Sequence, residues 1–139
     1  MTAAHINEIC VIEEESFSTP WSRGAFEREL KSDFAYYFAA LDENGAVAGY
    51  CGLWHVVNEG HITNIAVKPG FRNRGVGSML VEKLISFAVE KEMLGLTLEV
   101  RMGNRAAFAL YNRYGFKPEG IRKEYYGSGE DAVIMWKYF

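Results

Sequence analysis

The chain has 139 residues, of which 49% are hydrophobic and 24% charged, and its formal net charge is −3. This length and composition predict one folded domain, residues 1–139, with a single core. The slightly acidic balance disfavours a general nucleic-acid-binding protein. No apolar run is long enough to cross a membrane, and no secretory signal precedes the first helical pattern. We therefore expect a cytoplasmic protein with no nucleic-acid or membrane partner.

The cysteines and histidines give no sign of a disulfide or a metal site. Cys10 and Cys51 are far apart and lie in apolar patterns, which favours buried free thiols. His5, His55 and His61 lack the spacing of a metal-binding motif such as H-E-x-x-H. We expect no metal.

The N-terminal third predicts two helices. Residues 3–17 carry apolar side chains at roughly helical intervals, namely Ile6, Ile9, Cys10 and Phe17. The glutamates at positions 13–15 are interpreted as a solvated stretch without a catalytic role. Ser22 is placed to cap a second helix whose inner side includes Phe26 and Leu30.

Three strands are expected next, joined as an antiparallel meander. Asn44-Gly45 is a two-residue hairpin signal, and Asn58-Glu59-Gly60 predicts a second turn. The predicted strands are Tyr36–Asp42, Ala46–Val57 and His61–Val67.

The stretch after the third strand predicts an anion-binding loop. The run Arg72-Asn73-Arg74-Gly75-Val76-Gly77 leads directly into a helix expected from Gly75 to about Lys91. Unpaired N–H groups in a first helical turn attract a pyrophosphate, and glycine lets a phosphate approach the backbone closely. The R-x-x-G-x-G spacing differs from that of dinucleotide binders and P-loops, so another phosphate ligand is implied. A plain surface loop is the alternative for the isolated run.

The second half of the chain predicts two helices and three strands. The helix after the glycine loop carries an apolar stripe made of Val76, Leu80, Leu84, Phe87 and Ala88. In the strand Leu96–Val100, alternation places Thr97 and Glu99 on one face. Asn104 can cap a helix that runs to Tyr114, with Asn104, Ala107 and Tyr111 near one side and Gly115 as its stop. The last strands are Lys117–Tyr126 and Ala132–Tyr138, joined by a Gly127-Ser128-Gly129 loop interpreted as mobile.

Five motifs together resemble the GCN5-related N-acetyltransferases (GNAT). They are Asn64-Ile65-Ala66-Val67, the R-x-x-G-x-G run, Leu98-Glu99-Val100-Arg101, Asn104, and Ala109 to Phe116. Within that superfamily the chain is most similar to the RimI type, which acetylates the N-terminal alanine of a small-subunit ribosomal protein. The RimI-like stretches are Pro20-Trp21-Ser22, Gly52-Leu53-Trp54, Asn58 to Thr63, Tyr125-Tyr126 and Glu130-Asp131-Ala132.

The resemblance implies an α/β (α+β) GNAT fold, with a mixed, mostly antiparallel central sheet flanked by about four helices. Such chains normally begin with a strand before the first helix, whereas this sequence begins almost at the helix. The first edge strand is therefore expected to be missing or reduced, which should weaken the sheet edge more than the site.

Acetyl-CoA is the donor that the resemblance implies. Its pyrophosphate would lie on the amides from Asn73 to Ser78, and its pantetheine arm would bond to the exposed backbone of a strand edge. The implied cofactor-binding residues are Ile65, Ala66, Val67, Arg72, Asn73, Arg74, Gly75, Val76, Gly77, Ser78 and Asn104.

The family's general base falls at Glu99, which would accept a proton from the acceptor ammonium directly or through a water. A salt bridge, for instance with Arg101, is the alternative for an arbitrary strand glutamate. Tyr111 is the candidate acid for the departing thiolate, with helix packing as its alternative role. Each group would contribute about 10² to 10⁴ in rate.

The implied acceptor-binding residues are Trp21, Trp54, Glu59, Tyr125 and Tyr126. In RimI-like enzymes the paired tyrosines close over the first residues of the peptide and exclude an internal lysine. The expected function is acetylation of a protein N-terminus, with a ribosomal-protein alanine as substrate. The alternatives are a lysine or small-molecule amine acetyltransferase on the same scaffold, and a non-catalytic CoA-binding module. The last is disfavoured because the base and acid positions are intact.

Overall fold

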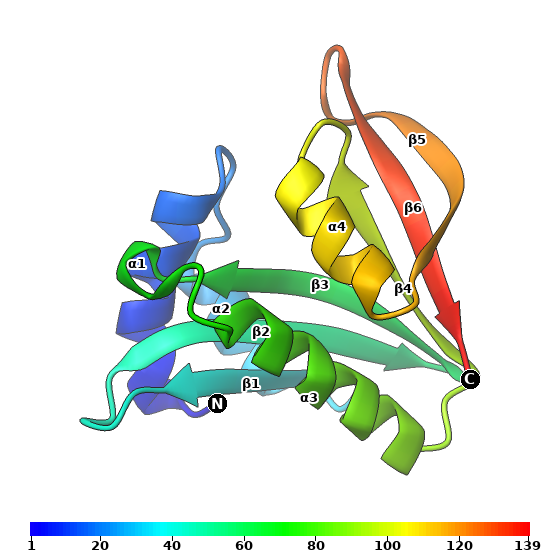
Figure 1. The fold of residues 1–139 in the computed structure, drawn as a ribbon. Helices are drawn as coiled ribbons and strands as arrows, with labels where there is room; N and C mark the ends of the chain where they lie inside the picture. The colour runs from blue at the N-terminus through cyan, green and yellow to red at the C-terminus, as the bar shows by residue number, and fades with distance from the viewer.

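A computed structural model describes residues 1–139 as a six-stranded sheet with helices on both faces (Figure 1). Short 3₁₀ turns at Ala3–His5 and Pro69–Phe71 precede α1 and α3, respectively. The elements in chain order are α1 (Ile6–Ser16), α2 (Arg23–Leu30), β1 (Ala35–Leu41), β2 (Val47–Val56), β3 (Glu59–Val67), α3 (Val76–Glu90), β4 (Gly95–Arg101), α4 (Arg105–Arg113), β5 (Lys117–Gly127) and β6 (Glu130–Tyr138).

The sheet has the order β1-β2-β3-β4-β6-β5, and every neighbouring pair is antiparallel except β3 with β4. The predicted mixed, mostly antiparallel sheet with four helices is confirmed. No strand precedes α1, so β1 forms the sheet edge, as expected. The N-terminal ammonium of Met1 lies there and donates to the carbonyl of Tyr37 at 3.3 Å.

The parallel pair opens along its length. β3 and β4 are paired only where Glu59, Gly60 and His61 face Gly95, Leu96 and Thr97. Beyond this point the strands separate, and Figure 1 shows β3 and β4 diverging from their common end near the C-terminus. β3 remains paired with β2, and β4 with β6. The facing edges of the two strands are therefore left without a strand between them.

A β-bulge in β3 lies at the start of this opening. Gly52 of β2 pairs with Asn64, whereas Leu53 pairs with Ile62, so Thr63 is the extra residue. The bulge changes which face of the sheet the following side chains occupy. Ile62 packs in the core under α3, while Ala66 packs in the core under α1 and α2.

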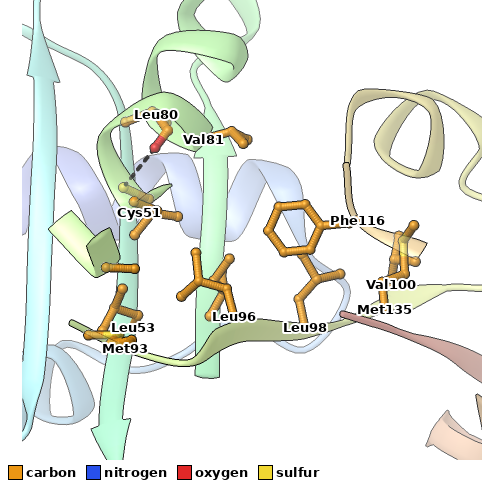
Figure 2. Close-up of a cluster of buried hydrophobic side chains, with 13 residues drawn as sticks. Cys51, Leu53, Leu80, Val81, Met93, Leu96, Leu98, Val100, Phe116 and Met135 are labelled. Carbon is orange, nitrogen blue, oxygen red and sulfur yellow. Dashed lines mark hydrogen bonds between the residues drawn. The ribbon is translucent and has the colours of Figure 1, made fainter. Parts of the chain in front are cut away.

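The sheet therefore carries two cores. One lies between the sheet and α3, and Figure 2 shows Cys51 of β2 beside Leu80 of α3, Leu53 beside Met93, and Phe116 beside Leu98. The other lies under α1 and α2 and consists of Ile6, Ile9, Ile12, Phe26, Tyr37, Val47, Tyr50 and Ala66. Burial of apolar area on both faces is the main force that holds the helices to the sheet.

The predicted helix ends are confirmed by their caps. The Ser22 hydroxyl accepts from the Ala25 amide at 3.1 Å, and the Asn104 side chain accepts from the Ala107 amide at 3.2 Å. Gly115 stops α4 with φ +94°, and Gly75 precedes α3 with φ +83°. Strand boundaries differ from the prediction by at most two residues. Local sequence defines the end of a strand less sharply than a capping residue defines the end of a helix.

Two expectations for the first helix are wrong. Glu13 is 1% exposed rather than solvated, because it lies on the same inward side as Ile9 and Ile12. Phe17 is 36% exposed, because α1 ends at Ser16 and the chain continues in an extended conformation.

The structure holds both cysteines as free thiols, as predicted. The Cys51 thiol is buried and donates to the Leu80 carbonyl (Figure 2), but Cys10 is only half-buried, contrary to expectation. No helix is long and apolar enough to cross a membrane. No group of three or more His, Cys, Asp or Glu side chains is arranged to hold a metal ion.

Candidate active site

A cavity of about 870 Å³ occupies the opening between β3 and β4. The loop between α1 and α2 closes one side, and α4 and the β5–β6 hairpin close others. The structure brings eight of the predicted site residues to its wall: Trp21, Trp54, Ile65, Glu99, Asn104, Tyr111, Tyr125 and Tyr126.

Glu99 projects from β4, and its side chain is 7% exposed. The Nε2 atom of His61 lies 2.7 Å from one carboxylate oxygen, and the Nε atom of Arg122 lies 3.2 Å from the other. Burial alone would raise the pKa of Glu99, but the hydrogen bond from His61 and the charge of Arg122 hold that pKa below its usual value. The carboxylate is therefore held in its charged form, with His61 hydrogen-bonded to one oxygen and Arg122 in an ion pair with the other.

Tyr111 projects from α4 into the cavity, and its ring packs against Phe116 at a centroid distance of 6.0 Å. Burial raises the pKa of Tyr111 above its usual range, and Tyr126 adds to this effect. The Tyr111 hydroxyl makes no hydrogen bond within the protein. Because every fully buried polar side-chain atom has a partner, this hydroxyl is not fully buried and opens to the cavity. A protonated, unpaired hydroxyl in a cavity is a competent donor for a ligand.

The glycine loop follows β3 and has the backbone of an anion cradle. Asn73 and Gly75 have φ of +62° and +83°, and no N–H group from Asn73 to Ser78 donates to another backbone group. Successive free amides at a helix start form a concave, partly positive surface. The loop residues Arg72 to Ser78 do not line the 870 Å³ cavity, and neither do Ala66 and Val67.

The two arginines of the loop are already engaged by the protein. Arg72 donates to the Val67 carbonyl at 3.2 Å and to the Ser16 hydroxyl at 3.5 Å, which ties the loop to the end of β3. The Arg74 guanidinium lies over the Phe71 ring at 5.2 Å.

Aromatic side chains form the opposite part of the cavity wall. The Trp54 indole donates to Glu29 at 2.9 Å, which fixes its ring on β2. The Tyr125 and Tyr126 rings lie 5.0 Å apart at 83°, and the Tyr126 hydroxyl donates to the backbone carbonyl of Glu99 at 3.1 Å.

Glu59 is the one predicted acceptor-binding residue outside this wall. It is exposed at the first position of β3, where it pairs with Val56 and Gly95.

Sequence reasoning missed four residues that shape the cavity. Arg101 lies 4.2 Å from the Tyr126 ring and bonds to Glu130 at 2.9 Å. Glu13 accepts from the Trp21 amide at 2.8 Å, from the Asn64 amide at 3.3 Å and from the Tyr50 hydroxyl. The other two are His61 and Arg122. No local pattern identifies these contacts, because the partners meet only through the sheet topology.

The sequence model of the Acetyltransferase (GNAT) family matches residues 6–116. The chain belongs to this family. A provisionally named [ribosomal protein bS18]-alanine N-acetyltransferase of Bacillus subtilis is 40% identical over 137 residues, which cover 98% of this chain and 91% of that protein. The [ribosomal protein bS18]-alanine N-acetyltransferase of Escherichia coli K12 is 35% identical, over 89% of this chain and 84% of that protein.

The fold agrees with these sequence relationships. The crystal structure of the ribosomal-protein-S18-alanine N-acetyltransferase from Escherichia coli superposes with a TM-score of 0.91. That comparison covers 99% of this chain and 90% of the other, at 32% identity. The GNAT fold expected from the sequence is therefore confirmed over nearly the whole chain.

Proposed function

We propose that this acetyltransferase moves the acetyl group of acetyl-CoA to the N-terminal α-amine of ribosomal protein bS18, at an alanine. The near full-length similarity to enzymes named for that reaction supports the substrate. The observation that carries the proposal is the cavity between β3 and β4, which has Glu99 and Tyr111 in its wall. With a ribosomal protein as substrate, the enzyme would act in the cytoplasm.

The residues present fit acetyl-CoA. The free amides from Asn73 to Ser78 would hold its pyrophosphate, and the unpaired edge of β3 at Ile65, Ala66 and Val67 would hold its pantetheine arm. Bound there, it supplies an activated thioester to the cavity. Backbone N–H groups of the same edge would stabilise the charge that develops on the thioester carbonyl oxygen. Asn104, whose side-chain oxygen caps α4, would contact the coenzyme from the far wall.

Proton transfers fall to two side chains of the cavity wall. The acceptor α-ammonium, with an ordinary pKa of about 7.7 to 8.0, must lose a proton before its nitrogen can attack. Glu99 is the proposed acceptor of that proton, directly or through a water. Tyr111, whose free hydroxyl opens on the cavity, is the proposed donor to the departing thiolate.

Selection of an N-terminus falls to the aromatic wall. Trp21, Trp54, Tyr125 and Tyr126 surround the space in which the first residues of a peptide would lie. The Tyr126 hydroxyl bonds to β4 and holds the paired tyrosines in place. In that position they would leave room for the end of a peptide but not for an internal lysine, whose peptide continues on both sides. Glu59 is proposed as an outer contact of the same peptide.

The test uses the purified chain, acetyl-CoA and three peptides of otherwise identical sequence, followed by mass spectrometry. The first peptide has a free N-terminal alanine and no lysine, the second is N-terminally blocked and carries an internal lysine, and the third is blocked without lysine. Acetylation of the first alone supports the proposal, as does acetylation of bS18 itself at its first residue. Modification of the second peptide would support a lysine acetyltransferase instead. CoA binding without modification of any peptide would support a non-catalytic module.

A further inference from the structure

The closest polar contact of Glu99 joins two strands far apart in the sequence. His61 lies on β3 and Glu99 on β4, at the point where the parallel strands begin to separate. The Nε2 atom of His61 is 2.7 Å from the Glu99 carboxylate. The imidazole also packs edge-on against Trp54, with ring centroids 5.8 Å apart. The ring is therefore fixed on two sides, at the mouth of the opening.

The partners of Glu99 determine which nitrogen of His61 carries a hydrogen. The Arg122 guanidinium forms an ion pair with the second oxygen of Glu99, which keeps the carboxylate ionised and able only to accept. A 2.7 Å contact with this carboxylate requires the hydrogen on Nε2. In the neutral imidazole the lone pair then lies on Nδ1, which no protein group contacts within hydrogen-bonding distance.

His61 has access to the cavity, where an acceptor amine would lie. It is one of the residues that line the cavity, and its side chain is 32% exposed. The arrangement resembles the general logic of a carboxylate that orients an imidazole and stabilises it once it is protonated. The charged and titratable side chains that line the cavity with His61 are Glu13, Glu99, Arg101, Tyr111, Tyr125, Tyr126 and Glu130. Arg122 is not part of the lining but contacts Glu99.

We propose that His61 is a catalytic base of this site and that Glu99 acts through it. The N–H bond of the acceptor ammonium breaks, its electron pair stays on the acceptor nitrogen, and a new N–H bond forms at Nδ1 of His61. The resulting imidazolium keeps its Nε2–H bond to Glu99, whose charge is preserved beside Arg122. The proton on His61 leaves to solvent after acetyl transfer. The second proton that the acceptor nitrogen loses as the amide forms replaces the one that Tyr111 gives to the thiolate. This inference rests on the proposed function and specifies where its proton goes.

A kinetic test distinguishes a His61 that accepts the proton from a His61 that only donates a hydrogen bond to Glu99. His61→Gln retains an amide N–H that can donate to Glu99, but it has no basic lone pair. We expect kcat for the alanine peptide to fall about 10- to 100-fold at pH 7, with the KM for acetyl-CoA unchanged. The deficit should shrink at pH 9, where solvent already deprotonates most of the amine. His55→Gln, on β2 and outside the cavity, is the matched control and should behave as the wild type.

Two kinetic outcomes would overturn the proposal. Wild-type kcat in His61→Gln at pH 7 would show that Glu99 needs only a hydrogen-bond donor from this position. A deficit of equal size at pH 7 and pH 9 would indicate a structural role. If the wild-type chain acetylates no N-terminal peptide, it is the proposed function that fails.

A spectroscopic measurement tests the same pair without any turnover. Nitrogen-15 NMR of the wild-type chain should show that, in the neutral form of the His61 imidazole, the hydrogen lies on Nε2. Replacing Glu99 by Gln should change the tautomer ratio of that ring and leave His5 and His55 unchanged. An Nδ1–H tautomer in the wild type, or a spectrum of His61 that is insensitive to Glu99→Gln, contradicts the proposed dyad.

Discussion

The two strands that form the opening contribute in different ways. Apart from the His61 side chain, β3 offers the cavity mainly its backbone: it has an unpaired edge beyond His61, a bulge at Thr63 and a loop of free amides after Val67. β4 offers side chains, because Glu99 and Arg101 project toward partners from β3, β5 and β6. A backbone surface suits a ligand that is the same in every turnover. Side chains suit proton transfer and the choice of acceptor.

The largest effect is expected from the side chains that handle protons. We expect Glu99→Gln to lower kcat about 10² to 10³-fold, because the carboxylate charge that supports proton removal is lost. Tyr111→Phe should lower kcat about 10²-fold, since it removes the only free hydroxyl of α4 in the cavity. Steady-state kinetics with an alanine peptide, under conditions where chemistry limits the rate, measures both.

Acetyl-CoA affinity serves as the control for these two variants. The backbone edge of β3 does not depend on either side chain, so the dissociation constant measured by calorimetry should change less than about twofold. Wild-type turnover in both variants would show that neither Glu99 nor Tyr111 takes part in proton transfer. A large loss of acetyl-CoA affinity would instead show that these side chains, and not only the backbone of β3, bind the coenzyme.

A second prediction concerns what holds the bulge of β3 in place. Glu13 is buried behind the bulge, where it accepts from Asn64, Tyr50 and the Trp21 amide. Glu13→Ala leaves two buried donors and one part-buried donor without an acceptor, which should lower the free energy of unfolding by about 3 kcal/mol. Urea denaturation measures this change.

Glu14→Ala is the matched control, because Glu14 is the exposed neighbour on the same helix. It should change the free energy of unfolding by less than about 0.5 kcal/mol. Equal stability of the two variants would mean that water replaces the Glu13 carboxylate without cost.

The difference between the strands also explains what the sequence alone could predict. The free amides before α3, the Asn104 cap and the alternation of Glu99 in β4 are local properties, and motifs within about ten residues identify them. The hydrogen bond of His61 with Glu99 spans 38 residues and follows from three paired positions between β3 and β4.

Burial of Glu13 shows the same limit. Three adjacent glutamates suggest a solvated helix face, and only the packing of α1 on the sheet places one of them inside. Its partner Asn64 lies 51 residues later in the chain. Helical periodicity does indicate that Glu13 lies on the inner side of α1, because Glu13 continues the spacing of Ile6 and Ile9.

A third prediction tests the backbone cradle directly. A Cβ at Gly77 would lie 3.4 Å from Leu110 and 3.9 Å from Val67, which are ordinary contacts, so Gly77→Ala should fold normally. The added methyl group would crowd a pyrophosphate on the neighbouring amides, and we expect CoA affinity to fall about tenfold. Calorimetry measures the affinity, and kcat at saturating acetyl-CoA should stay near that of the wild type.

Gly70→Ala is the control for that variant, because a Cβ at Gly70 meets nothing within 4 Å and the residue precedes the cradle. Arg74→Ala should weaken CoA binding by a smaller factor, since its guanidinium is exposed and its charge is screened. Unchanged CoA affinity in both Gly77→Ala and Arg74→Ala would count against the cradle.

The smallest effect is expected where β3 is still fully paired. Glu59 is exposed at the start of β3 and does not line the cavity, whereas Trp54 does. Trp54→Leu should raise the KM for the alanine peptide about tenfold, because a fixed aromatic wall is lost. Glu59→Gln should raise it less than about threefold, since an exposed, screened charge contributes little. Peptide KM values at two salt concentrations measure both. A large, salt-sensitive effect of Glu59→Gln on the peptide KM would show that the bound peptide extends beyond the opening and contacts the end at which β3 and β4 are paired.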